Sequence, residues 1–394
     1  MRISGTGCCL VDSIYMNCHY SSQEFSPYWS KQRGDGGLIE GGLVFREDLE
    51  TFSEKSFSEI LNSLTQGRTP HIINLGGPAI IALVHVAQVF TQDDVEVSFY
   101  GAIGDDANGN VIRSKLLNVP IQTYLKRIEG EPTPTTDVFD DPQSREGKGE
   151  RSFINTIGAA ASFSEQDLPD SFYDSDIILL GGTALVPNLH DASHTILEKA
   201  KKSGCITVVS TVYDFRNEKA HPEKPWPIGE HSSYQHIDLL VTDQEEALRL
   251  SGKVDIYEAA DTLISFGIGA LIITRGAHDI LIWSGGNLLE EHDLTSYPVS
   301  AYIDELMAKD PSLRKDTTGC GDNFIGGILI ALAGQLKSGK TKDLDILDLS
   351  AWGASSGGFT CTYHGGMYEE SLQGEKASCI APAVKAYKET VGVR

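Results

Sequence analysis

The residues best suited to chemistry stand in the segment 316–322, DTTGCGD. Two glycines flank a small residue, directly before apolar residues spaced as on one face of a helix. A glycine-rich turn that opens a helix directs backbone N–H groups and the positive end of the helix dipole toward one point. Such a turn can hold a phosphate or a developing anion, and Asp322 could take a proton from an attacking hydroxyl group. An ordinary Asp-capped helix start is the alternative interpretation of the same pattern.

A second segment matches a phosphate-binding pattern letter by letter. Residues 334–341, GQLKSGKT, fit the P-loop pattern GxxxxGK[ST], which requires a strand before it and a helix directly after it. Here a helical pattern precedes the segment, and the acidic stretch 343–350 follows it. We therefore interpret 334–341 as a polar loop between two helices. A P-loop NTPase that depends on Lys340 is the alternative.

Composition excludes several classes of protein. The chain has 394 residues and a formal net charge of −23, with 32 Lys and Arg against 55 Asp and Glu. A nucleic-acid-binding protein needs a basic face, so no nucleic-acid partner is expected. Seven cysteines without a CxxC pair predict reduced thiols, a cytoplasmic protein and no zinc site. Residues 69–92 carry no Asp, Glu, Lys or Arg, but their prolines, glycines and polar residues predict a buried strand–turn–helix and no membrane span.

The elements that must position the turn are strands and helices in alternation. Apolar runs separated by helical patterns predict an α/β fold with a parallel sheet covered on both faces. The clearest runs are 176–180, 205–210, 237–242 and 270–274. The β-rich segments 13–50 and 121–160 do not follow this alternation, and we expect them to form a small β lid on a single domain spanning 1–394. Exposed edges of that lid could pair with a second copy, so a homodimer is expected.

Five motifs give the chain a family resemblance. DTTGCGD followed by NFIGGILIAL is similar to the signature of the ribokinase/PfkB carbohydrate-kinase family, in which Ala is usual at the position of Cys320. Four other segments resemble further family motifs in the family's order: GGPAIIALVHVAQ (76–88), FYGAIGDDANG (99–109), LLVTDQEEALRLSG (239–252) and LIITRGAHDILI (271–282). The resemblance covers nearly the whole chain. It implies a ribokinase-like three-layer α/β/α fold and a kinase that transfers the γ-phosphoryl group of ATP to a hydroxyl of a sugar or related polyol, with Mg²⁺.

The resemblance also implies a role for each matching residue at the phosphoryl-transfer centre. Asp322 would be the general base on the acceptor hydroxyl. The backbone N–H groups of Gly319, Cys320 and Gly321 would form an anion hole for the γ-phosphoryl group, and the Cys320 thiol would take no part. This small set suffices because phosphoryl transfer depends mainly on positioning and charge stabilisation.

Substrate and nucleotide residues follow from the same resemblance. Asp12 would bind substrate hydroxyls, and Gly76 and Gly77 would let the backbone approach the sugar closely. The residues implied on the nucleotide side are Asp243, Thr274 and Gly276, with Glu246 organising Mg²⁺ through water. Independently of the resemblance, Arg216 could reach the nucleotide or the product phosphate as a fixed cation. For each residue the alternative is an ordinary structural role, such as a helix cap, a tight turn or a surface ion pair.

Two positions depart from the family's pattern. Ile80 stands where the family has a sugar-binding Asn, and Asp279 stands where a Gly is usual in the nucleotide loop. Both departures bear on the ligands and leave the phosphoryl-transfer centre intact. They also motivate an alternative of another class, a non-catalytic member that only binds a ligand, against which the intact turn at Asp322 argues.

The substrate is left open between two kinds of small molecule. A sugar or polyol is the first interpretation, and a nucleoside is the alternative within the same family. Aromatic side chains of the lid that stack on a base, with Tyr28, Trp29 and Tyr302 as candidates, would favour the nucleoside.

Overall fold

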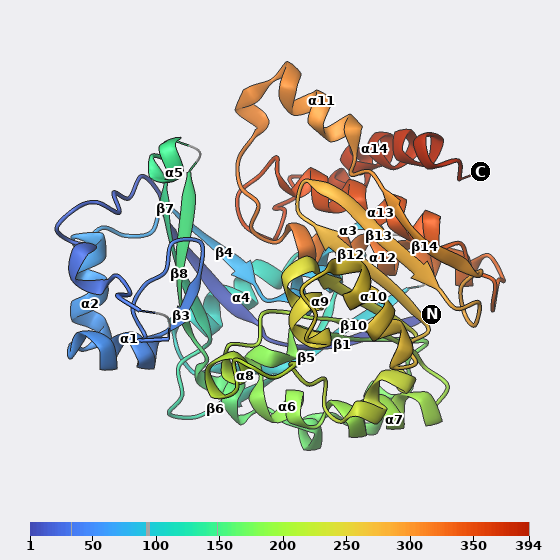
Figure 1. The fold of residues 1–394 in the computed structure, drawn as a ribbon, viewed down its shortest axis with the longest axis horizontal. Helices are drawn as coiled ribbons and strands as arrows, with labels where there is room; N and C mark the ends of the chain where they lie inside the picture. Colours follow the sequence, from blue (N-terminus) through green and yellow to red (C-terminus); the bar gives the residue numbers. More distant parts are fainter. Residues whose placement is uncertain (33, 92–94, 148, 394) are drawn as a thin grey trace.

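The computed structural model describes residues 1–32, 34–91, 95–147 and 149–393, which are organised around two β-sheets (Figure 1). Positions 33 and 148 of the segments predicted as a lid lie outside these ranges, as does the last residue of the predicted domain. Within the described ranges, no helix combines the length and the apolar character needed to cross a membrane.

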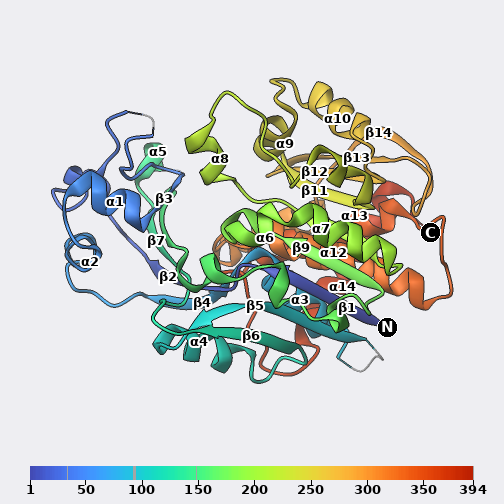
Figure 2. The same ribbon diagram turned by 90° about the horizontal axis from the view of Figure 1, so that it is seen from below.

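The large sheet has nine strands in the order β14-β13-β12-β11-β10-β9-β1-β5-β6 (Figure 2). Their bounds, in that order, are His292–Tyr297, His278–Ser284, Ala270–Arg275, Leu239–Asp243, Ile206–Ser210, Ile177–Gly181, Arg2–Gly7, Glu96–Gly104 and Gln122–Ile128. From β6 to β12 neighbouring strands are parallel, as predicted, whereas β13 and β14 are antiparallel. The two residues between β12 and β13 are too few for a crossover, so that pair forms a hairpin.

Helices cover both faces of the large sheet. Because side chains alternate along a strand, Ile3, Leu179 and Val208 face one helical layer, and Ile178 and Leu180 face the other. The first layer consists of α3 (Pro78–Val89), α12 (Cys320–Lys337), α13 (Ile346–Thr360) and α14 (Glu375–Val391). The second consists of α6 (Pro187–Asp191), α7 (Ser193–Lys202), α9 (Gln244–Ser251) and α10 (Ile256–Ser265). The predicted three-layer α/β/α fold is confirmed.

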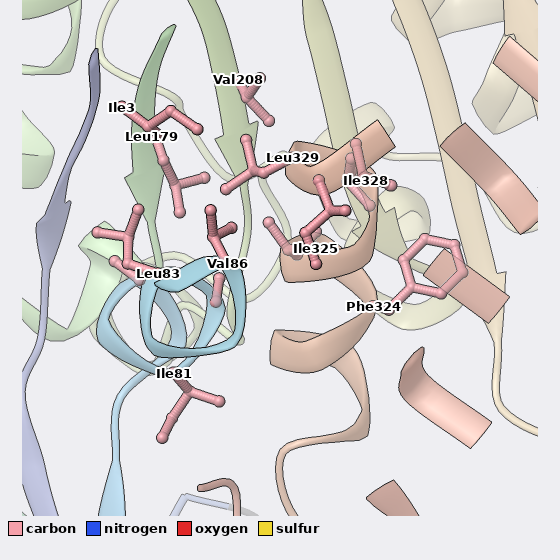
Figure 3. Close-up of a cluster of buried hydrophobic side chains, with 14 of the residues drawn as sticks. Ile3, Ile81, Leu83, Val86, Leu179, Val208, Phe324, Ile325, Ile328 and Leu329 are labelled. Carbon is pink, nitrogen blue, oxygen red and sulfur yellow. The ribbon is translucent and has the colours of Figure 1, made fainter. Parts of the chain in front are cut away.

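Helices α3 and α12 form the centre of the first layer. Figure 3 shows Leu83 and Val86 of α3 and Leu329 of α12 directed toward the strand residues Leu179 and Val208. All five side chains are excluded from solvent. This apolar contact fixes the two helices on the sheet, and with them the turns at which the helices begin.

The small sheet has the order β3-β8-β7-β2-β4 and projects from one end of the molecule with α1 and α2 against it (Figure 1). Its strands are Leu43–Phe45, Glu150–Thr156, Thr135–Asp141, Leu10–Tyr15 and Ile72–Gly76, and the helices are α1 (Arg46–Ser53) and α2 (Phe57–Thr65). One face has its own core, in which Tyr28, Leu49, Phe139 and Ile154 are buried.

The strands of the small sheet differ in part from the predicted segments 13–50 and 121–160. Strand β6, at 122–128, lies in the large sheet, because it completes a β5–α4–β6 crossover and pairs parallel with β5. Strands β2 and β4 both contribute to the small sheet, although β2 begins before residue 13 and β4 lies at 72–76.

The remaining helices are short. The α-helices are α4 (Ala107–Leu116), α5 (Ser144–Gly147), α8 (Phe215–Ala220) and α11 (Ala301–Lys309). The 3₁₀-helices are Ser26–Tyr28, Gly158–Ser162, Glu165–Asp167, Asp170–Phe172, Thr183–Leu185, His231–His236 and Pro311–Leu313.

Candidate active site

The carboxyl ends of the parallel strands form one edge of the large sheet, and predicted site residues gather there. Strand β1 lies between β5 and β9, so the strand order changes direction on its two sides. In open α/β sheets, ligands bind in the crevice outside the carboxyl ends at such a point. The chain leaves β1 toward Asp12, and α12 begins in the helical layer packed against the same strands.

The glycine turn before α12 has the predicted form. Gly319 has a φ of +78°, and a Cβ at this position would lie 2.4 Å from the Cα of Gly366, so only glycine fits. Gly321 is exposed, and nothing would lie near an added Cβ. The Cys320 N–H donates to the Thr317 carbonyl at 3.2 Å. An anion can therefore approach the backbone at Gly321, but the Cys320 N–H would have to share its present bond.

Asp322 and Asp12 lie within electrostatic reach of each other. Burial raises the pKa of Asp322, in the first turn of α12, to about 6. Burial, with the negative charges of Asp322 and then Asp316, raises the pKa of Asp12 to about 8. Near neutral pH, Asp322 is therefore mostly ionised while Asp12 holds a proton. Two carboxyl groups whose pKa values differ in this way suit different chemical roles.

Gly76 and Gly77 bring the backbone against Asp12. A Cβ on Gly76 would stand 2.4 Å from Oδ2 of Asp12. Gly77 has a φ of +111°, and a Cβ there would stand 2.2 Å from the Cys8 carbonyl oxygen. The pair ends β4 and opens α3. The structure thus brings these glycines together with the carboxylate that the sequence predicted to bind substrate.

A row of polar side chains crosses the small sheet at Asp12. The strand register places Asn74, Asp12, Thr136 and Asn155 side by side on neighbouring strands, and all four are buried. Asn155 Nδ2 donates to Thr136 Oγ1 at 3.0 Å, and Thr136 forms a hydrogen bond with Asp12. We call these four residues the polar row. Of the four, only Asp12 could be predicted from the sequence, because the row exists only once the strands are paired.

The polar row is joined to a loop beside the glycine turn. Asn74 Nδ2 donates to the carbonyl groups of His364 and Met367, at 2.9 and 3.1 Å. Asn323, next to Asp322, donates to the carbonyls of Gly319 and Gly366, at 2.9 and 2.8 Å. The loop that follows α13 therefore holds the small sheet and the start of α12 at a fixed spacing.

Arg151 is a second site residue that the sequence did not reveal. It lies on β8, and its guanidinium donates to Asp316 Oδ1 at 2.7 Å, to Thr317 Oγ1 at 2.6 Å and to Thr318 Oγ1. Arg151 and Asn155 are four residues apart on the same strand, so they share the face that carries the polar row. This contact confirms that the polar face of the small sheet is directed at the glycine turn.

The residues predicted on the nucleotide side gather at the ends of β11 and β12. Asp243 and Thr274 are register partners, and Gly276 follows with a φ of +62° and open space around it. Glu246 is buried in a capping box in which its carboxylate accepts from the Asp243 N–H and from the Thr211 and Thr242 hydroxyls. Burial, and then the charge of Asp243, raises the pKa of Glu246 to about 8.

The surroundings of Glu246 fit a magnesium ion that is bound mainly by phosphate and water. In the described residues, no group of three or more His, Cys, Asp and Glu side chains could hold a metal ion. Mg²⁺ commonly takes one or two carboxylates, several waters and phosphate oxygens. A cation would also relieve the cost of ionising the buried Glu246 carboxyl.

Arg216, Ile80 and Asp279 each have a structural partner or environment of their own. The Arg216 guanidinium, on α8, forms a bidentate ion pair with the Asp191 carboxylate. Ile80 is fully buried in α3, so its side chain belongs to the core. Asp279 accepts a 3.0 Å hydrogen bond from Ser296 Oγ on the neighbouring strand β14.

The segment that matches the P-loop pattern has the wrong surroundings for phosphate binding. Residues 334–337 are the last residues of α12, and the next helix, α13, begins at Ile346. A helix therefore stands where a P-loop needs a strand, and no helix follows directly. The interpretation of 334–341 as a helix–helix connection agrees with the structure.

The sequence did not reveal one further cluster of side chains, which lies near the residues predicted on the nucleotide side. A small hollow lined by Thr183, His190, Thr211 and Asp214 lies at the ends of β9 and β10. His190 Nδ1 is 2.9 Å from Thr183 Oγ1, and Nε2 is 3.3 Å from Asp214 Oδ2. Thr183 and His190 lie in short helices after β9, and Thr211 and Asp214 follow β10, so the hollow forms only when the two strand ends lie side by side.

Comparison with known proteins decides the family. The profile described as pfkB family carbohydrate kinase matches residues 58–371, which is well over half of the chain. The chain belongs to the pfkB family of carbohydrate kinases. This membership confirms the predicted family and the predicted class of enzyme, an ATP-dependent carbohydrate kinase.

Relatives of this pfkB-family kinase are distant in sequence and similar in fold. A fructokinase of Vibrio alginolyticus is 24% identical over 262 residues, which are 66% of this chain and 76% of the relative. A solved adenosine kinase of Sinorhizobium meliloti has a TM-score of 0.68 at 18% identity and covers 96% of this chain and 98% of its own. A ribokinase of Giardia lamblia has a TM-score of 0.65 at 15% identity, with 99% of both chains covered. At these identities the solved structures support the fold alone.

Proposed function

We propose that this kinase transfers the γ-phosphoryl group of ATP to a hydroxyl group of a sugar or related polyol, with Asp322 as general base. The observation that carries the proposal is the position of Asp322. It lies in the first turn of an 18-residue helix that opens on glycines, and the polar face of the small sheet points at that turn. Its pKa of about 6 keeps the carboxylate ionised at neutral pH and able to accept a proton.

The proposed reaction needs few groups from the protein. Substrate hydroxyls bind to the polar row, chiefly to Asp12. Gly76 and Gly77 leave space for the sugar. Asp322 takes the proton from the acceptor hydroxyl as its oxygen attacks the γ-phosphorus in line with the departing ADP. The backbone N–H groups of Gly319, Cys320 and Gly321 and the dipole of α12 stabilise the charge on the transferred group.

On the nucleotide side, Asp243, Thr274 and Gly276 would line the phosphates. Mg²⁺, held through water by Glu246, would neutralise charge on the phosphate oxygens. Arg216 could bind a phosphate only after its ion pair with Asp191 breaks. We therefore assign it no role in the first contact with the nucleotide.

A sugar fits the contacts better than a nucleoside does. Tyr28 is fully buried in the core of the small sheet, and the Trp29 indole donates to the Tyr20 carbonyl and packs on Phe25. Neither of these two rings is free to stack on a base, whereas Tyr302 is exposed on α11, outside the small sheet. The polar row on the other face consists of amide, hydroxyl and carboxyl groups, which suit a molecule with several hydroxyls. The relatives named fructokinase support the same choice.

Three further expectations belong to the proposal. The small sheet acts as a lid whose closure excludes water from the transfer step. Its edge strands β3 and β4 are the surfaces through which a homodimer would form. Seven free thiols support a reducing, cytoplasmic setting.

An assay of phosphoryl transfer tests the proposal. The purified chain is incubated with ATP, with and without Mg²⁺, against a panel of sugars, sugar phosphates and nucleosides, and products are identified by mass. We expect Mg²⁺-dependent turnover on at least one sugar. Turnover confined to nucleosides would contradict the substrate class, and no turnover on any compound would favour a ligand-binding protein without activity.

A further inference from the structure

Two cysteines meet at the glycine turn. Cys320 is the first residue of α12, Cys361 follows the last residue of α13, and their Sγ atoms are 3.5 Å apart. A disulfide bond has an S–S distance of about 2.05 Å, so a movement of about 1.5 Å would join them. Both side chains are only partly buried, unlike Cys8, Cys9 and Cys205. A small oxidant can therefore reach the pair from solvent.

The surroundings of the pair favour reaction at Cys361. The hydrogen bond from Cys320 lowers the pKa of the Cys361 thiol and raises that of Cys320, so Cys361 is the first of the two to lose its proton. Asp304 and Asp316 oppose ionisation of Cys361, whereas Arg314 favours it. The thiolate is the reactive form of cysteine, so Cys361 is the attacking group and Cys320 completes the bond.

The backbone around the pair is attached to the catalytic segment at both ends. The Lys315 N–H, just before Asp316, donates to the Cys361 carbonyl at 2.8 Å. At the other end of the turn, the Cys320 side chain touches the Cys361 side chain. The end of α13 therefore supports the turn between residues 315 and 320, and a covalent bond there would pull on the N–H groups at the start of α12.

We propose that Cys320 and Cys361 form a reversible disulfide that displaces the anion hole and switches off phosphoryl transfer. The disulfide follows from the position of the two thiols alone, and its effect on turnover rests on the proposed function. The partner is a low-molecular-weight disulfide, R–S–S–R. The Cys361 thiolate attacks one of its sulfurs and releases one RS⁻; Cys320 then loses its proton, attacks the Cys361 sulfur and expels the second RS⁻. The protein loses two thiols and two RSH molecules form, so atoms and electrons balance.

The test uses the full chain, incubated with oxidised glutathione or with dithiothreitol. Free thiols are alkylated, and disulfide-linked peptides are mapped by mass spectrometry without reduction. We expect a Cys320–Cys361 peptide pair, a fall of about 100-fold in turnover, as for the loss of one anion-hole donor, and recovery in dithiothreitol. Cys361→Ala should keep its turnover in oxidised glutathione. Cys379→Ala, which removes an exposed thiol on α14, is the matched control and should respond as the unmodified chain does.

The peptide mapping tests the disulfide whether or not the chain is an active kinase. Absence of the linked pair overturns the inference. A linked pair with unchanged turnover also overturns it, as does equal loss of turnover in Cys361→Ala. A reduced chain that turns over no substrate contradicts the proposed function instead, and the mapping then decides whether the disulfide site exists.

Discussion

Arg151 of the small sheet donates a 2.7 Å hydrogen bond to Asp316, the first residue of the turn that leads into α12. The same guanidinium also binds Thr317 and Thr318, so one side chain of the small sheet holds three residues in a row. The position of the small sheet and the shape of the glycine turn are therefore coupled.

Removal of this arginine should slow the enzyme without unfolding it. We expect Arg151→Ala to lower kcat/KM by about 10- to 100-fold, the loss that corresponds to hydrogen bonds from a charged group. Arg151→Lys should restore little of it, because an ammonium group cannot reproduce the planar fork. Arg145→Ala, which removes a neighbouring arginine paired with Glu150, is the control and should have nearly normal kcat/KM. Equal effects of the two alanine variants would refute a specific role for Arg151.

The pH profile should report the ionisation of Asp322. Its pKa is raised to about 6, and only the ionised form can accept the proton from the substrate. We therefore expect kcat/KM to be level just above pH 6 and to fall about tenfold per unit as the pH drops below it. Steady-state assays at saturating ATP measure this directly. A profile that stays flat down to pH 5 would show that no group with such a pKa acts as the base.

Asp12 should lower the folding stability of the protein at alkaline pH. Its pKa rises from 3.8 to about 8 on folding, so the folded state holds a proton that the unfolded state has lost. Folding stability therefore falls as the pH rises from about 4 to about 8, and the cost is complete above pH 8. Asp12→Asn should raise the melting temperature at pH 8 by a few degrees and have little effect near pH 4.

The same substitution should weaken substrate binding, with an increase in KM of about tenfold. Asp137→Asn is the matched control, because burial raises the pKa of Asp137 to about 7 on the neighbouring strand β7, one register position from Asp12. We expect Asp137→Asn to be more stable at alkaline pH and to have a normal KM. If Asp137→Asn raised KM as much as Asp12→Asn did, Asp12 would have no particular contact with substrate.

Lys340 should be dispensable. It lies in the connection between α12 and α13. In these described residues a helix precedes the segment, so the strand–loop–helix of a P-loop is not formed there. We expect Lys340→Ala to have kcat and KM values for ATP within about twofold of those of the unmodified chain, since exposed substitutions rarely have larger effects. Loss of turnover in this variant, measured beside Arg151→Ala, would revive the P-loop interpretation.

The local sequence was sufficient to predict those parts of the site that are formed by one short segment. Gly319 and Gly77 have positive φ angles, and an added Cβ at Gly319, Gly76 or Gly77 would come too close to its neighbours. The residue type at these positions therefore reflects the local backbone. The strand–helix alternation likewise predicted the three layers. Strand β6 was misplaced because a short edge strand has the same local pattern in either sheet.

The residues that the sequence did not reveal are brought together by strand pairing and by loops. Arg151 is 165 residues from Asp316, and the polar row depends on the register of four strands. Cys361 meets Cys320 only because α12 packs against α13. For Arg216, the charge suggested a phosphate ligand, and the structure supplies Asp191 as its partner from another helix.

The most direct test of the central claim is the turnover number of Asp322→Asn, measured on the sugar that the unmodified chain phosphorylates. Asn has the same shape and cannot accept the proton, so we expect kcat to fall by about 10²- to 10⁴-fold, with KM for ATP nearly unchanged. The melting temperature at neutral pH should be equal or higher, because the substitution removes the cost of ionising the buried Asp322 carboxyl. Asp293→Asn, which changes an exposed residue of strand β14, is the control and should have normal kcat. A folded Asp322→Asn protein with kcat close to that of the unmodified chain would contradict the assignment of Asp322 as the general base.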